Sequence, residues 1–305
     1  MRIAAAVVIL LTSSALADEV TLQTPTGTLY GTLLVPPARA TLPVVLIIAG
    51  SGPTDRDGNS ALEEVPNNSY RMLAEALAAQ GIASLRYDKR GVAASAAAFT
   101  SDMTIETEIS DAIGWLQQLR SDPRFSLLIV AGHSEGSLIG IIAAERMPVD
   151  RVISLAGAGR PAGDVILSQI EAQFTPALID AARKIVASLN AGVTVPNSMV
   201  PFGLRFIFDE SGQPYLISWF RYDPAVEIGR LMIPVLIVQG TADTQVTIDD
   251  AMRLSNANRV AELQIITGMN HELKDASDPT SPIDRILVAT VTSFIQPPVR
   301  RRAVR

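Results

Sequence analysis

The sequence contains no cysteine and only two histidines, His133 and His271, among its 305 residues. Without cysteine the chain can form no disulfide, no thiolate metal site and no cysteine nucleophile. Two histidines also argue against a metal site built from several imidazoles. They leave few candidates for a histidine that acts as a general base.

Basic side chains, and charged residues in general, are scarce. Lys and Arg total 25 against 31 Asp and Glu, a formal charge of −6, whereas nucleic-acid binding requires clustered Lys and Arg. The 48% of hydrophobic residues and 18% of charged residues exclude a disordered polyampholyte. A chain of this length forms one large domain or about two smaller ones, with a sizeable buried core.

Long hydrophobic runs are also missing, since no segment reaches the roughly 20 apolar residues of a membrane-spanning helix. The apolar run from Ile3 to Leu11 follows Arg2 and precedes Ala15-Leu16-Ala17. This pattern predicts a signal peptide over residues 1–17 and a periplasmic or secreted protein without an integral membrane segment. An uncleaved anchor or a core helix is the alternative. We expect residues 297–305 to form a flexible basic tail.

The rest of the chain alternates apolar strand patterns with amphipathic helix patterns. We expect strands at 20–24, 28–35, 44–49, 82–87, 127–131, 152–156, 235–239 and 263–266. We expect helices at 69–80, 104–120, 137–146 and 281–295. The alternation favours an α/β fold with a mostly parallel central sheet flanked by helices, after an antiparallel start.

The segment 158–231 interrupts this rhythm because it has no buried-strand pattern. We interpret it as a helical cap inserted into a core formed by residues 18–157 and 232–296, with a helical stretch over 162–189. Seven of the 15 aromatic residues of the chain lie in the second half of this segment, over 199–230. We expect some of them to line a substrate cleft and others to form the core of the cap. They are Phe202, Phe206, Phe208, Tyr215, Trp219, Phe220 and Tyr222.

A nucleophile motif, Gly132-His133-Ser134-Glu135-Gly136, lies between a predicted strand and a predicted helix. A serine in such a sharp turn has a strained backbone, and glycine on either side avoids Cβ clashes with neighbouring backbone. Ser134 is the predicted nucleophile, and Gly132 and Gly136 are the predicted elbow glycines. The N–H group of Glu135, unused at the start of the helix, is a predicted oxyanion donor.

Only two histidines can take the proton of the serine. His133 adjoins Ser134, and its side chain should point away from the serine at this turn, so we expect it to pack beside the elbow. His271, immediately after the last predicted strand, is therefore the predicted base.

A carboxylate must orient the base and stabilise its imidazolium form. Asp243 follows the predicted strand 235–239 and is the predicted residue. Asp249 and Asp250 are rivals, although both resemble the start of the following helix, where aspartate is common as a cap.

The second oxyanion donor is expected in the glycine-rich turn after the strand 44–49. The N–H group of Ser51 is the predicted donor, with Gly52 as the alternative. The loop 55–59 resembles part of a calcium loop but lacks the remaining ligands, so we predict no metal site there. We expect Arg56 in this loop to pair with carboxylates and brace the oxyanion turn.

Five motifs together carry a family resemblance. They are Gly50-Ser51-Gly52-Pro53-Thr54-Asp55-Arg56-Asp57-Gly58-Asn59, Arg86-Tyr87-Asp88-Lys89-Arg90-Gly91, Gly132-His133-Ser134-Glu135-Gly136, Gly240-Thr241-Ala242-Asp243 and Asn270-His271. With them the sequence resembles the α/β-hydrolase superfamily, and more narrowly the bacterial carboxylesterases related to the S9/S33 serine peptidase families. One departure is Ala49, which stands where many esterases and lipases carry the His of a His-Gly pair.

The resemblance implies ester hydrolysis through an acyl-enzyme, without a cofactor. It implies Ser134 as nucleophile, His271 as base and Asp243 as orienting acid, in the chain order of this superfamily. It also implies an oxyanion hole formed by backbone N–H groups near Ser51 and Glu135.

The leading hypothesis is a carboxylesterase that cleaves small-molecule esters with short to medium acyl chains. The first alternative is an S9/S33-type aminopeptidase or amidase, which needs an acidic group for the substrate amine; Glu63-Glu64 is the candidate. The second alternative is an inactive hydrolase fold that binds a ligand. The sequence carries no signal for an oligomeric state.

Overall fold

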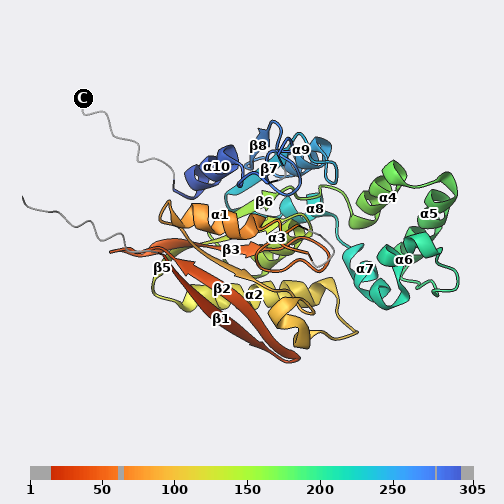
Figure 1. Cartoon of the computed structure of the whole chain (residues 1–305), viewed down its shortest axis with the longest axis horizontal. Helices are drawn as coiled ribbons and strands as arrows, with labels where there is room; N and C mark the ends of the chain where they lie inside the picture. The colour runs from red at the N-terminus through yellow and green to blue at the C-terminus, as the bar shows by residue number, and fades with distance from the viewer. Residues whose placement is uncertain (1–14, 61–64, 279, 297–305) are drawn as a thin grey trace, which may run out of the picture.

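The computed structural model describes residues 15–60, 65–278 and 280–296, within which an eight-stranded sheet is covered by helices on both faces (Figure 1). Most of the predicted signal peptide, the basic tail 297–305 and Glu63-Glu64 lie outside the described residues. The first strand begins at Leu16, so the predicted cleavage after Ala17 falls within it.

The order of the strands across the sheet is β1-β2-β4-β3-β5-β6-β7-β8. The pairs β1–β2 and β2–β4 are antiparallel and the other neighbours are parallel, which confirms the predicted mostly parallel sheet. The bounds are β1 (Leu16–Thr24), β2 (Gly27–Val35), β3 (Leu42–Ile48), β4 (Ala83–Tyr87), β5 (Phe125–His133), β6 (Arg151–Leu155), β7 (Val235–Gly240) and β8 (Glu262–Ile266).

Two hydrophobic cores separate the sheet from its helices. Val45 and Leu46 are neighbours on β3 and are both fully buried, one in each core, because side chains alternate across a strand. One core is covered by α1 (Ser69–Ala78) and α10 (Arg285–Ile295). The other is covered by α2 (Ile105–Ser121), α3 (Glu135–Arg146), α8 (Pro224–Ile228) and α9 (Ile248–Ala257). A short 3-10 helix, η1 (Ala93–Ala98), precedes α2.

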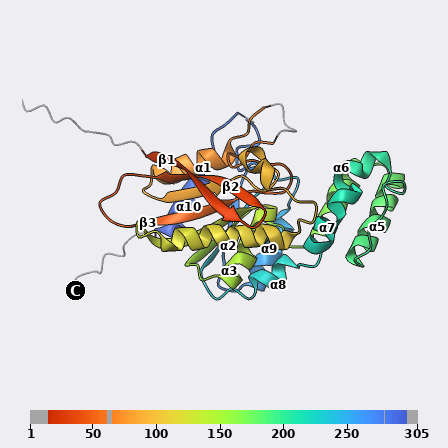
Figure 2. The same cartoon turned by 90° about the horizontal axis from the view of Figure 1, so that it is seen from below.

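A helical insertion follows β6, as predicted, and α4–α7 extend to one side of the sheet and its flanking helices (Figures 1 and 2). Its elements before α8 are α4 (Ala162–Gln173), α5 (Pro176–Asn190), η2 (Phe202–Leu204), α6 (Arg205–Phe208), η3 (Glu210–Gly212) and α7 (Gln213–Trp219). They enclose a hydrophobic core of their own, which includes Leu189, Leu204 and Phe208.

The helical stretch expected over 162–189 is two helices rather than one. α4 ends at Gln173, and α5 begins with Pro176 in its first turn. Proline has no N–H group to continue a helix and disfavours helical backbone at the residue before it, whereas it fits the first turn of a new helix. The break therefore falls where the proline requires it.

Candidate active site

Ser134 lies in a turn between the end of β5 and the start of α3. Its backbone has φ 53° and ψ −119°, a conformation that a residue with a Cβ rarely adopts. Strain of this kind costs about 1–3 kcal/mol and persists only where the surroundings impose it. Here the Ser134 N–H group donates to the Leu155 carbonyl at 2.9 Å, and the Ser134 carbonyl accepts from Ser137 N–H at 3.0 Å.

The two glycines that flank this turn have no room for a side chain. A Cβ atom on Gly132 would lie 2.0 Å from the carbonyl oxygen of Gly136. A Cβ atom on Gly136 would lie 2.5 Å from the carbonyl oxygens of Ile48 and Ala49. The start of α3 therefore packs directly against β5 and the end of β3, and this packing presents Ser134 above the sheet.

Asp243 and His271 are hydrogen-bonded to each other through His271 Nδ1 and Asp243 Oδ2, 2.8 Å apart. The Asp243 carboxylate is held by further donors: the amides of Gln245 and Val246 at 2.8 and 2.9 Å, and Gln239 Nε2 at 3.0 Å. Burial alone would raise the pKa of Asp243, but the hydrogen bonds from His271 and the two amides outweigh it and lower the pKa below its ordinary value. A carboxylate on Nδ1 leaves Nε2 free to accept a proton.

Ser134 is exposed to two adjoining cavities. It shares the smaller one, of about 130 Å³, with Ser51 and His271. It shares the larger one, of about 520 Å³, with Ser51 and Glu135. Asp243 lines neither and lies behind His271, with its side chain fully buried. Both sequence-predicted oxyanion residues thus adjoin the serine.

His133 is part of a hydrogen-bonded chain that the sequence did not reveal. The Gly50 N–H group donates to Tyr70 Oη at 3.0 Å, Tyr70 Oη lies 2.8 Å from His133 Nδ1, and His133 Nε2 lies 2.8 Å from the carbonyl oxygen of His271. Because that carbonyl can only accept, Nε2 carries the proton and Nδ1 accepts from the tyrosine hydroxyl. Burial, followed by the charge of His271, lowers the pKa of His133 to about 3, so it stays neutral.

Polar contacts hold the turn at Gly50 and the loop after it, and Arg56 pairs with a carboxylate, as expected. Arg56 forms two hydrogen bonds from its side chain to Asp88 Oδ2, at 3.0 and 2.8 Å. Lys89 Nζ, also buried, donates to the carbonyl oxygen of Gly50 at 2.6 Å. In the loop 55–59, Asp55 Oδ1 accepts from the N–H groups of Asp57 and Asn59, so this carboxylate closes its own turn.

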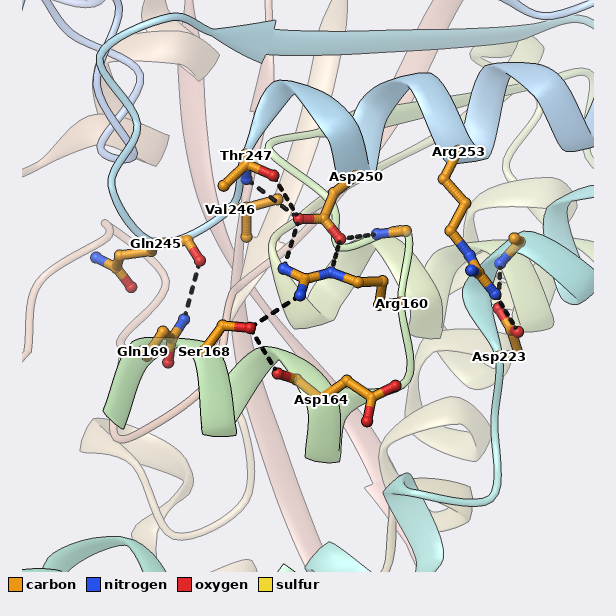
Figure 3. Close-up of polar contacts among 12 residues, drawn as sticks. Arg160, Asp164, Ser168, Gln169, Asp223, Gln245, Val246, Thr247, Asp250 and Arg253 are labelled. Atoms are coloured by element: carbon orange, nitrogen blue, oxygen red, sulfur yellow. Dashed lines mark hydrogen bonds and ion pairs between the residues drawn. The ribbon is translucent and has the colours of Figure 1, made fainter. Parts of the chain in front are cut away.

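The cap is bonded directly to the loop that carries Asp243 (Figure 3). Gln169 on α4 donates from Nε2 to the carbonyl oxygen of Gln245 at 3.1 Å. Arg160 donates to both oxygens of Asp250 at 2.9 and 3.0 Å. Asp250 also caps α9 together with Thr247, as the sequence indicated, but its pairing with Arg160 carried no sequence signal.

Some aromatic residues of the cap line the larger cavity and others pack in its interior, while Phe202 is exposed. Phe206, Tyr215 and Trp219 line the cavity, whereas Phe208 and Phe220 are buried in the core of the cap. Tyr215 Oη also donates to Glu135 Oε1 at 2.8 Å, which joins α7 to the residue after the serine. Sequence reasoning also missed that Glu108 and Lys89 line this cavity.

The described residues hold no group of three or more acidic or histidine side chains suited to a metal ion. Within the same ranges, no helix has the length and apolar character needed to cross a bilayer.

Comparison with known proteins identifies relatives of this fold. Residues 67–201 match the family model for serine aminopeptidase, S33. The esterase EstD of Thermotoga maritima is 28% identical over 261 residues, which cover 84% of this chain and 60% of EstD. The chain therefore spans less than two thirds of the length of this relative.

Solved structures give the same fold. Est1E from Butyrivibrio proteoclasticus, with ferulic acid bound, has a TM-score of 0.59 at 18% identity, covering 90% of this chain and 96% of Est1E. The Pyrococcus furiosus esterase Pf2001 has a TM-score of 0.61 at 16% identity, covering 92% of this chain and 91% of that one. The chain has the α/β-hydrolase fold, and its residues 67–201 resemble the S33 family. The five motifs thus indicated the fold correctly.

Replacing Gly136 tests the packing around the serine. Gly136→Ala should abolish activity or prevent folding, because the added Cβ meets two backbone carbonyls that cannot move independently of β3. Gly212→Ala is the matched control, since a Cβ there meets nothing within 4 Å. The two variants are compared by thermal melting and by ester turnover; a fully active, stable Gly136→Ala protein would contradict the packing described.

Replacing Tyr70 tests the hydrogen-bonded chain. Tyr70→Phe removes both the donor to His133 and the acceptor for Gly50 N–H, so we expect kcat to fall by about tenfold while KM changes little. Tyr30→Phe is a matched control on β2, outside both cavities. Equal kcat and KM values for Tyr70→Phe and the unmodified enzyme would show that these hydrogen bonds do not hold the residues around Ser134 in place.

Proposed function

We propose that this hydrolase is a serine carboxylesterase that cleaves small-molecule esters with short to medium acyl chains. The proposal depends above all on one observation: His271, already bonded to Asp243 through Nδ1, lines the same small cavity as Ser134. An imidazole oriented by a carboxylate beside a strained serine can activate that serine as a nucleophile.

In the proposed reaction, Ser134 Oγ attacks the ester carbonyl while His271 Nε2 takes the hydroxyl proton. The N–H groups of Ser51 and Glu135 stabilise the negative oxygen of the tetrahedral intermediate. His271 then protonates the leaving alcohol, which departs and leaves the acyl-enzyme. A water molecule, deprotonated by His271, attacks the acyl group and releases the acid and free Ser134.

The relatives support ester cleavage, since EstD and Pf2001 are both named as esterases. The larger cavity supports a small substrate: its volume of about 520 Å³ lies in the range of ligand pockets, and its lining includes Leu138, Val165 and Trp219.

A second candidate is an aminopeptidase, which the description of the matching family model favours. The two differ in the bond that is cleaved, so an aminoacyl anilide and the corresponding aminoacyl ester, assayed side by side, separate them. Turnover of the ester with little turnover of the anilide is the expected result.

Replacing Ser134 tests the proposal. Ser134→Ala should lower kcat on p-nitrophenyl acyl esters by on the order of a thousandfold or more, and a fluorophosphonate probe should label the unmodified enzyme on the peptide that contains Ser134. Ser121→Ala, an exposed serine at the end of α2, is the control that should keep its activity. Unchanged turnover in Ser134→Ala, or a label on another peptide, would refute the assignment.

We also propose that the protein is exported to the periplasm or secreted, with residues 1–17 as its signal. The support is the sequence pattern of one Arg, an apolar run and Ala15-Leu16-Ala17. Expression of the full chain in a Gram-negative host should give a periplasmic protein whose N-terminal residue, read by mass spectrometry, is Asp18. A full-length cytoplasmic product would contradict export.

A further inference from the structure

The lining of the larger cavity includes a buried residue with a carboxyl group, Glu108. Glu108 on α2 lines this cavity together with Ser134, and it is only 4% exposed. Its Oε2 has no hydrogen-bond partner among the described residues. A buried acceptor without a donor costs free energy, and a ligand that supplies the donor recovers it.

The other charged residues that line the cavity are already paired. Glu135 accepts from Tyr215 at 2.8 Å and lies 3.6 Å from Lys89, which also donates to the Gly50 carbonyl. Two arginines are paired with aspartates, Arg90 with Asp111 at 2.6 Å and Arg160 with Asp250 at 2.9 Å. Among the described charged residues that line the cavity, Glu108 is therefore the one whose carboxyl group is available to bind a substrate.

We propose that Glu108 is a specificity-determining residue that binds a hydroxyl group carried by the ester substrate. The hydroxyl belongs to the part of the substrate that fills the larger cavity and points away from the reacting carbonyl. The proposal rests on the proposed esterase function and names a substrate class for it: esters with a distal, uncharged hydrogen-bond donor.

The surroundings of Glu108 favour a hydroxyl over an ammonium group. The half-buried aromatic side chains of Tyr215 and Trp219 line the same cavity, so a charged substituent beside them would lose part of its hydration. Burial raises the pKa of Glu108 to about 7, against the opposing charge of Lys89, so acid and carboxylate are both populated near neutral pH. A hydroxyl can accept from the acid and donate to the carboxylate.

Groups from several elements act on the ionisation of Glu108 or are acted on by it. They are Lys89, Arg90, Asp111, Glu135, Tyr87 and Tyr215. Burial is the first cause of the raised pKa of both tyrosines, so neither titrates near neutral pH.

Matched esters test the proposal. One pair is methyl phenylpropanoate and its para-hydroxyphenyl analogue, which places the hydroxyl on the acyl side; the other is phenethyl acetate and its para-hydroxy analogue, which places it on the alcohol side. We expect the hydroxylated ester of one pair to have a kcat/KM about tenfold higher, the typical effect of one hydrogen bond to a charged group. Equal values within both pairs would overturn the proposal, and so would a stronger preference for a para-aminomethyl analogue.

Variants at position 108 assign the preference to this residue. Glu108→Leu should reduce the ratio of the two kcat/KM values to about one. Glu145→Leu is the matched control, because Glu145 also has an unpartnered buried oxygen and a pKa raised to about 7 but lies outside the cavity. A preference lost equally in both variants, or kept in Glu108→Leu, would refute the assignment.

The pH dependence of the preference for the hydroxylated ester distinguishes substrate binding by Glu108 from a purely structural role. The kcat/KM of the hydroxylated ester, divided by that of its unhydroxylated partner, should rise as the pH increases through about 7, because the carboxylate is the stronger acceptor. Taking the ratio cancels every effect of pH that is common to both esters. Glu108→Gln should give a ratio that does not change with pH, and a pH-dependent ratio in this variant would contradict the proposal.

Affinity gives a readout that does not need turnover. Calorimetric titration of Ser134→Ala with each ester pair should give the same preference, about tenfold in Kd, and Glu108→Leu in that background should remove it. An enzyme that cleaves no ester would refute the esterase proposal alone, while equal affinities within both pairs would refute the role of Glu108.

Discussion

The site depends on the close approach of backbone to backbone around Ser134. With carbonyl oxygens 2.0 and 2.5 Å from where Cβ atoms would lie on Gly132 and Gly136, the first turn of α3 fits against β3 and β5 only if both positions lack side chains. That fit maintains the positive φ of Ser134 and sets the direction of the N–H group of Glu135. The stability of the central sheet thus supports a conformation that the serine would not adopt by itself.

A second layer of polar contacts joins segments that are far apart in the sequence. The neutral ring of His133 is hydrogen-bonded on one side to Tyr70, which binds the backbone of Gly50, and on the other side to the backbone of His271. On the other side, Lys89 holds the same glycine by its carbonyl oxygen. The groups proposed to polarise the substrate and those proposed to move its protons are therefore parts of one buried network, whose members lose little entropy on substrate binding because they are already fixed.

Sequence reasoning predicted the sheet and its flanking helices well, because buried parallel strands such as β3 and β5 are unbroken apolar runs. It also placed Ser134, Asp243 and His271 at strand ends that one sheet edge brings together. It could not predict the pairing of Arg160 with Asp250 or the partners of His133, since those contacts join residues 90 and 138 positions apart. Nothing in the helical pattern of α2 distinguishes Glu108 from an exposed charged residue. It lines a cavity because the cap packs over this part of α2.

The hydrogen bonds between the cap and the loop that carries Asp243 limit how the cap of such a fold can be exchanged (Figure 3). Gln245 donates from its N–H group to Asp243, and its carbonyl oxygen accepts from Gln169 on α4, so the backbone of one residue contacts both the core and the insertion. A cap transplanted from another lineage would need to bring its own donors for that carbonyl and for the Asp250 carboxylate. Exchange of caps among proteins with this fold would therefore have to preserve at least these two contacts.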